Sequence, residues 1–155
     1  TDINLLLEKV IFTLIKKNPA AYFDTLIQWI REDNELVSVS IVKLIFRIVK
    51  NDNDLLKKFF NKMENRWMNA SPAFVKVNSL MLKMLAKTDE KFYLSVYDSY
   101  KSTREPVFVE ILSAALCLYS PNLESYYENW SKSGNARVKK AALSGLKFLL
   151  KKKGN

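Results

Sequence analysis

A pair of adjacent aromatic residues recurs four times along the chain at nearly constant intervals. The intervals are 37, 33 and 34 residues, and the pairs are Tyr22-Phe23, Phe59-Phe60, Phe92-Tyr93 and Tyr126-Tyr127. A large apolar residue follows each pair by about one helical turn: Leu26, Met63, Val96 and Trp130. This recurrence, with two helices in each repeat, is typical of an α-solenoid. Base stacking is an alternative role for the pairs, but their core spacing favours packing.

The rest of the chain also has helical periodicity. Apolar residues recur at i, i+3, i+4 and i+7, and the chain holds only three glycines and four prolines, which favours long helices over tight β-turns. Turn and capping residues divide it evenly, and Ser71-Pro72 reads as an N-cap followed by proline. The sequence predicts nine helices, near 3–17, 20–31, 36–50, 54–68, 72–87, 89–101, 106–119, 122–132 and 135–152.

Two helix types alternate. The A type carries the aromatic pair, and the B type carries an aliphatic stripe whose phase can be aligned between repeats. One aligned position holds Ile41, Asn78, Leu112 and Ala142, and the next turn holds Ile45, Leu82, Leu116 and Leu146. We expect the three tryptophans to be partly buried near helix ends: Trp29, Trp67 and Trp130.

The last repeat carries the clearest family resemblance. Residues 133–146 (SGNARVKKAALSGL) resemble the second helix of a HEAT repeat, with a polar turn, Val-Lys, small residues and leucines. Ala141, Ala142 and Gly145 are expected to allow close helix approach. The resemblance implies an all-α, right-handed superhelix of the HEAT/armadillo-like kind. It would form one domain over 1–155, with helix pairs at 20–50, 54–87, 89–119 and 122–152 and one further N-terminal helix.

A narrower resemblance concerns residues 18–34 and 127–135, which are similar to repeats of the bacterial DNA alkylation-repair glycosylases. Those enzymes are HEAT-like solenoids that hold a DNA duplex in a basic concave groove. Their catalytic Trp-Trp-Asp segment has no counterpart here, so no residue is assigned as catalytic. The acids near tryptophans, such as Asp33 and Glu128, are expected in turns or on outer helices.

The charges are unevenly distributed between the helix types. The chain has 25 Lys and Arg against 16 Asp and Glu, a formal charge of +9. The first helix and the B helices hold 16 of the basic residues and, as acids, Glu8 and Glu110 alone. The family resemblance puts the B helices on the concave face, so this face is predicted to be strongly positive. The expected polyanion-binding residues are Lys43, Arg47, Lys50, Lys76, Lys83, Lys87, Lys140 and Lys147.

The chain lacks residues that several kinds of catalytic and metal site require. Histidine is absent, which excludes zinc sites built on His/Cys sets and Ser-His or Cys-His nucleophile pairs. The one cysteine, Cys117, cannot form an internal disulfide and is expected to be buried. No apolar run reaches the roughly 18 residues of a membrane span. We expect no cofactor and no metal, and a monomer in the cytoplasm, or in the nucleus of a eukaryote.

These observations predict a non-catalytic module whose basic face binds a nucleic-acid backbone, DNA in preference to RNA. One alternative is a protein-interaction scaffold that docks an acidic segment on the same face. Another is an enzyme related to the DNA glycosylases. The same charges on a merely solvated face would serve solubility alone.

Overall fold

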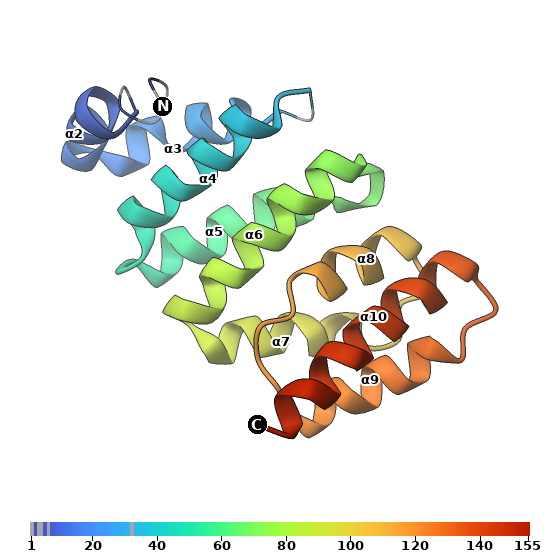
Figure 1. Ribbon diagram of the computed structural model, residues 1–155. Coiled ribbons are helices and arrows are strands. Elements are labelled where there is room, and N and C mark those ends of the chain that lie inside the picture. The colour runs from blue at the N-terminus through green and yellow to red at the C-terminus, as the bar shows by residue number, and fades with distance from the viewer. Residues whose placement is uncertain (1, 3–4, 6, 32) are drawn as a thin grey trace. The chain divides into compact units, whose positions relative to one another are not determined.

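The described chain is all-α. The computed structural model describes residues 2, 5, 7–31 and 33–155, and these residues contain no strand (Figure 1). In the first half, the helices are the π-helix η1 (Leu7–Ile11), α2 (Phe12–Lys17), α3 (Pro19–Gln28), α4 (Glu35–Val49), α5 (Asn53–Glu64) and the 3₁₀-helix η2 (Trp67–Asn69). In the second half, they are α6 (Pro72–Thr88), α7 (Glu90–Tyr100), α8 (Pro106–Ala114), α9 (Pro121–Ser131) and α10 (Ala136–Lys153).

The helices fall into two compact units. Unit 1 holds the described residues up to Arg66 together with Ala70–Val77, and unit 2 holds Trp67–Asn69 and Asn78–Asn155, so α6 begins in one unit and ends in the other. The single repeat domain over 1–155 and its right-handed superhelix stay predictions. Within the described residues, none of the helices is both long enough and apolar enough to cross a membrane.

The predicted helices are confirmed, with shifts at their ends. The expected start at residue 3, with Leu6, lies outside the described residues, as does Glu32 of the turn before α4. The helix expected over 54–68 ends at Glu64 and resumes as η2. The helix expected over 106–119 ends already at Ala114.

Side-chain caps begin most of the helices, as the turn residues predict. Each capping oxygen accepts a hydrogen bond from a backbone N–H two or three residues further on, which satisfies a donor that the helix itself leaves free. The capping residues are Asn34 for α4, Asp52 for α5, Ser71 for α6, Asp89 for α7, Ser120 for α9 and Asn135 for α10.

The core of unit 1 surrounds α4, which packs against α2, α3 and α5. Phe59 of α5 lies edge-on to Phe23 of α3 and to Phe46 of α4, with ring centroids 6.2 and 5.5 Å apart. Most residues of α4 are buried by these neighbours, and each buried Leu, Ile or Phe contributes roughly 1.5–3 kcal/mol. Little of the surface of α4 therefore remains exposed to solvent.

In unit 2, two buried tyrosines donate hydrogen bonds to carbonyls at the end of α8. The hydroxyl of Tyr97 donates to the carbonyl of Leu112, and that of Tyr93 donates to the carbonyl of Ala115, both at 2.9 Å. These hydroxyls occupy carbonyls at the end of α8. Pro121, which supplies no N–H, follows a few residues later. The chain over 115–120 is consequently non-helical.

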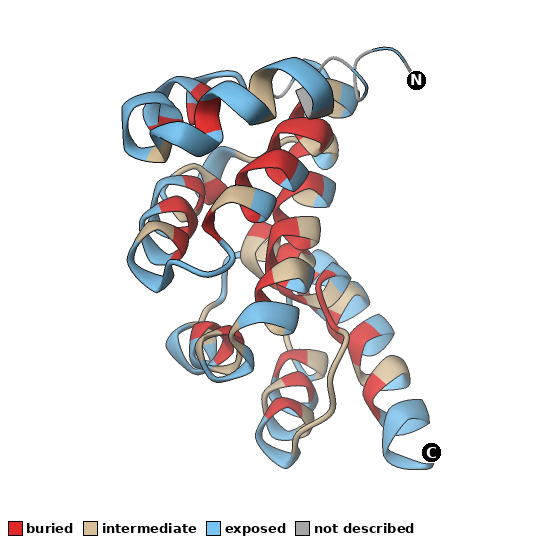
Figure 2. Cartoon of the chain, turned by 90° about the vertical axis from the view of Figure 1, so that its left-hand side faces the viewer, coloured by how far each residue is buried: buried red, intermediate tan, exposed pale blue. Residues whose placement is uncertain are grey.

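One member of each aromatic pair is a core residue, as the spacing of the pairs predicts, whereas the other member is buried in one pair of the four. The second member of every pair is buried: Phe23, Phe60, Tyr93 and Tyr127. The first member ranges from buried Phe59 to Tyr22, which is 46% exposed. The aligned B-helix positions are also buried, except for half-buried Leu146. Figure 2 shows the result along α10, the helix that leads to the C label, with buried residues on one side and exposed ones on the other.

Two of the three tryptophans are more deeply buried than the sequence predicts. Trp29 is 45% exposed, but Trp67 and Trp130 are buried rather than partly buried. Both buried indoles find acceptors, because Nε1 of Trp67 donates to Oδ1 of Asn78 at 3.0 Å and Nε1 of Trp130 donates to the carbonyl of Thr103 at 3.1 Å. A satisfied N–H removes the main penalty for burying the whole ring.

Candidate polyanion-binding surface

The structure places all eight predicted cations on the surface. Lys43 and Arg47 lie in α4 with Lys50 at its end, Lys76, Lys83 and Lys87 lie in α6, and Lys140 and Lys147 lie in α10; every one is exposed. Unit 1 holds Lys43, Arg47, Lys50 and Lys76, and unit 2 holds the other four. The expectation that these eight cations share one concave face spans both units and stays a prediction.

The α4 strip, Lys43, Arg47 and Lys50, is the best-defined group. Within α4 itself the exposed residues are Leu36, Lys43 and Arg47, because the neighbouring helices cover most of the rest. The spacing of i, i+4 and i+7 puts the three cations on one face. The strip therefore forms most of the exposed surface in the second half of α4 and at its end.

A neighbouring helix adds a cation to the α4 strip. The guanidinium of Arg47 lies over the ring of Phe12 in α2, 4.5 Å from its centroid, and the ammonium of Lys16 lies 5.9 Å from the same centroid. The negative ring face attracts both cations. Phe12 thus brings positive charge from α2 and α4 together within unit 1.

Lys76 is less available than the α4 strip. Its ammonium lies 3.6 Å from a carboxylate oxygen of Glu35, which the structure places in the first turn of α4 rather than in the preceding turn. Glu35 must therefore be added to the acids of the B helices. The side chain of Glu8, the other acid expected near this end, lies outside the described side chains.

In unit 2, the one acid on α8 is neutralised. Glu110 receives two hydrogen bonds from Arg137 of α10, from Nε at 2.9 Å and from a terminal guanidinium nitrogen at 2.8 Å. The hydrogen bonds and the adjacent negative charge raise the pKa of Arg137. Lys140 follows Arg137 by three residues on the same helix face, and Lys147 follows two turns later. The negative charge that Glu110 brings to the B helices is consequently offset by Arg137.

Lys83 and Lys87 lie beside an apolar cavity of about 380 Å³ that Leu80, Cys117 and Leu118 also line. Cys117 is half-buried rather than buried, since α8 ends before it and the residue falls in the non-helical chain over 115–120. The two lysines therefore border an apolar surface, unlike the α4 strip.

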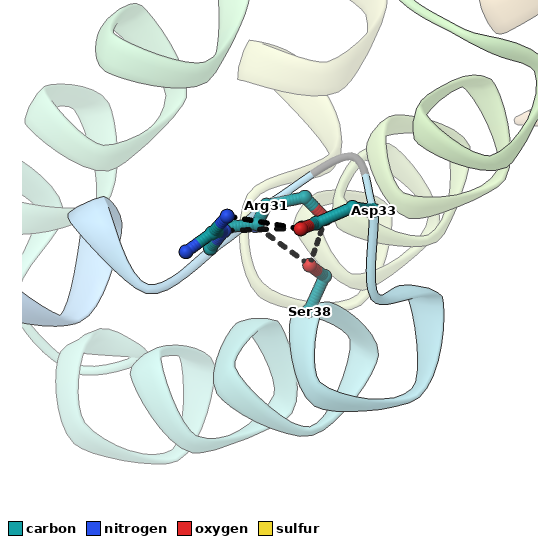
Figure 3. Close-up of polar contacts among 3 residues, drawn as sticks. All are labelled: Arg31, Asp33 and Ser38. Carbon is teal, nitrogen blue, oxygen red and sulfur yellow. Dashed lines mark hydrogen bonds and ion pairs between the residues drawn. The ribbon is translucent and has the colours of Figure 1, made fainter.

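The two acids named near tryptophans, Asp33 and Glu128, lie in a turn and on the surface of α9. Asp33 lies in the turn between α3 and α4, where both of its carboxylate oxygens accept hydrogen bonds from Arg31 at 3.0 and 2.9 Å (Figure 3). Buried Ser38 fixes the same turn, since its hydroxyl accepts from the N–H of Arg31 and donates to the carbonyl of Arg31. Glu128 is exposed on α9. The geometry around Asp33 is that of a structural turn.

A second basic group, which the predicted site does not include, lies at two turns of unit 2. Lys101, Arg104 and Lys132 line one cavity together with serine, threonine and asparagine side chains. The signal in the sequence is that the α7–α8 turn and the α9–α10 turn both begin with lysine followed by serine. In the assignment from the sequence, the A helices and turns hold the remaining nine basic and 14 acidic residues. Their overall negative charge conceals this local basic group.

Comparisons with models of protein families, with curated proteins and with solved structures found no match to this chain. The HEAT-like resemblance of the last repeat therefore remains a prediction.

Proposed function

We propose that the protein is a non-catalytic binding module whose basic strips bind the phosphate backbone of nucleic acid. DNA is the proposed ligand ahead of RNA because of the resemblance to solenoids that hold a duplex. The observation that carries the proposal is the α4 strip, where two of the three exposed residues of a largely buried helix are cations and a third cation, Lys50, follows at the end of the helix. Rows of cations neutralise phosphates and release condensed counterions, which gives binding without sequence preference.

The residue types favour a backbone over base edges. Seven of the eight predicted contacts are lysines, which act as point charges, and the one arginine, Arg47, already lies over Phe12. Readout of base edges uses paired hydrogen bonds, most often from arginine to guanine, and the eight predicted contacts contain a single arginine. The proposed binding is therefore positioned by phosphates and does not depend on sequence.

Salt dependence tests the proposal. Fluorescence anisotropy with a labelled duplex of mixed sequence, measured at several salt concentrations, should give tighter binding at low salt. With about six phosphate contacts, log K against log salt should have a slope near −5. An absence of salt-sensitive binding at micromolar protein would contradict the proposal.

Charge reversals locate the residues that bind the phosphates. Lys43→Glu in unit 1 and Lys140→Glu in unit 2 should weaken binding and make the slope shallower by about 1 for each phosphate that is no longer neutralised. Lys91→Glu is the matched control, since Lys91 is exposed in the first turn of α7, pairs with no described residue and is not one of the eight predicted cations. Equal weakening by all three variants would show that net charge alone is responsible.

An acidic protein segment is the second candidate ligand, and one feature of α10 favours it. Leu143 and Leu150 are 49% and 50% exposed and lie two turns apart, with Lys140 and Lys147 beside them. Apolar anchors at i and i+7 with flanking cations suit an amphipathic acidic helix. For that ligand, Leu143→Ser should weaken binding as much as Lys147→Glu, whereas DNA binding should be insensitive to Leu143→Ser.

A further inference from the structure

A cavity of about 710 Å³ opens at two turns of unit 2, and none of the eight predicted cations lines it. The α7–α8 turn contributes Lys101 and Arg104, and the α9–α10 turn contributes Lys132 and Gly134. We call it the turn cavity. Its volume lies within the range of about 300–1,000 Å³ that is usual for small-molecule sites.

The turn cavity is positively charged without compensation. Lys101, Arg104 and Lys132 line it, no aspartate or glutamate does, and none of the three cations forms an ion pair with a described residue. Elsewhere in unit 2, basic side chains such as Arg137 and Lys153 are paired with carboxylates. Three unpaired cations around one concave surface favour an anion with more than one negative charge.

Hydrogen bonds hold both walls of the turn cavity in place. Trp130 of α9 donates to the carbonyl of Thr103, which ties the first turn to the helix beneath it. Within the turns, the hydroxyl of Thr103 accepts from the N–H of Glu105, and that of Ser133 accepts from the N–H of Asn135. The cavity is thus preformed, which lowers the entropic cost of binding a ligand.

The first turn of α10 also faces this region. Asn135 and Val138 line the cavity, and Asn135 caps the helix by accepting from the N–H groups of Arg137 and Val138. A helix N-terminus carries a partial positive charge of roughly half an elementary charge. The dipole therefore adds to the field of the three cations.

We propose that the turn cavity binds the phosphate monoester of a small polar molecule. Guanidinium and ammonium groups recognise the several oxygens of a phosphate, with arginine able to form two parallel hydrogen bonds. The cavity is larger than a phosphate group needs, and beside its three cations it is lined by the hydroxyl and amide side chains of Ser102, Thr103, Asn129, Ser133 and Asn135. The organic part of the ligand is consequently polar.

Calorimetric titration of the full chain with ribose 5-phosphate, ribose and inorganic phosphate tests this proposal. Ribose 5-phosphate should bind, ribose should not, and inorganic phosphate should bind more weakly than the ester because it fills less of the cavity. Absence of binding by ribose 5-phosphate would overturn the proposal, and so would equal affinity for inorganic phosphate, which would leave a site for free anions only.

Variants then place the ligand. Arg104→Gln and Lys132→Gln should each lower the affinity about tenfold, since each removes a charge-assisted hydrogen bond. Lys91→Glu should bind ribose 5-phosphate as the parent does. If Arg104→Gln and Lys132→Gln also bind as the parent does, the ester binds elsewhere and the proposal is wrong.

A third variant blocks the cavity directly. A Cβ atom at Gly134 would meet no atom within 4 Å, and this glycine does not have a positive φ, so Gly134→Glu should fold and add a carboxylate to the cavity. Gly134→Glu should abolish binding, and Gly134→Gln, of similar bulk, should bind more tightly than Gly134→Glu. Equal affinities of these two variants would contradict a charge-based site. The test uses a single small ester, so its outcome is independent of polyanion binding by the α4 strip.

Discussion

Gly145 of α10 lies so close to the ring of Tyr127 in α9 that no side chain fits between them. A methyl group on Gly145 would meet Cε1 and Cδ1 of Tyr127 and would lie 3.0 Å from a methyl carbon of Leu116. The tyrosine ring cannot easily move, because it is buried and lies edge-on to Trp130 with centroids 5.0 Å apart. This contact sets the close approach of α9 and α10.

Gly145→Ala should therefore destabilise the protein, although alanine is the better helix former. Overpacking of this kind costs about 1–3 kcal/mol, against a gain of about 1 kcal/mol in helix propensity. Thermal unfolding followed by circular dichroism measures the difference. Gly134→Ala is the matched control, since its methyl group meets no atom, and its melting temperature should equal or exceed that of the parent. A melting temperature of Gly145→Ala at or above the parent's would contradict the expected steric conflict.

The hydroxyl of Tyr97 is expected to stabilise the end of α8. Tyr97→Phe removes the hydroxyl that donates to the carbonyl of Leu112 and that lies 2.9 Å from the hydroxyl of Tyr93. Loss of this buried hydroxyl should lower the free energy of unfolding by about 1–2 kcal/mol, as measured by urea denaturation. In the control, Tyr126→Phe removes an exposed hydrogen bond to Asp98 and should cost less. Equal costs would show that burial does not determine the contribution.

Alkaline pH should unfold the protein by ionising buried tyrosines. Burial raises the pKa of Tyr93, Tyr97 and Tyr127 in the folded state well above the ordinary value of about 10. In the unfolded chain these phenols titrate near pH 10, so the unfolded state loses protons first. Stability is fully present below that pH and falls as the pH rises above it. Tyrosinate absorbance should therefore increase in two steps, with the second step coinciding with loss of helical circular dichroism. A single step with the helices intact would contradict this assignment.

Glu110→Gln should strengthen polyanion binding if α10 contributes to it. The substitution removes the carboxylate that holds Arg137 at 2.8 Å and frees the guanidinium. With one more cation free to neutralise a phosphate, the slope of log K against log salt should become steeper by about 1. Glu128→Gln is the control with the same change of net charge, because Glu128 is exposed on α9 outside the strips. Equal gains from both variants would assign the effect to net charge.

Local features of this fold could be predicted from the sequence. The caps at Asn34, Asp52 and Asp89 follow from side chains that compete with water for the first N–H groups of a helix. The burial of Phe23 and Tyr127 follows from their recurrence at core spacing. The exposure of Lys43 and Arg47 follows from the same periodicity, because residues outside the apolar stripe of α4 lie on the face opposite the core and are therefore exposed to solvent.

Features that depend on distant side chains could not be predicted. At the end of α8, carbonyls accept hydrogen bonds from Tyr93 and Tyr97, which lie 22 and 15 residues earlier in the chain. The pairing of Glu110 with Arg137 spans 27 residues. No periodicity within a helix encodes these distances, which follow from how α7, α8 and α10 pack.

The narrow exposure of α4 separates the residues that hold this helix in place from the residues proposed to bind a ligand. Its buried residues make the apolar contacts, whereas Lys43 and Lys50 are exposed and Arg47 lies over the ring of Phe12. Lys43 and Lys50 can therefore be substituted, for example by glutamate or serine, while the helix keeps its apolar neighbours. Under the proposed function, such substitutions would exchange one class of ligand for another without a change of fold.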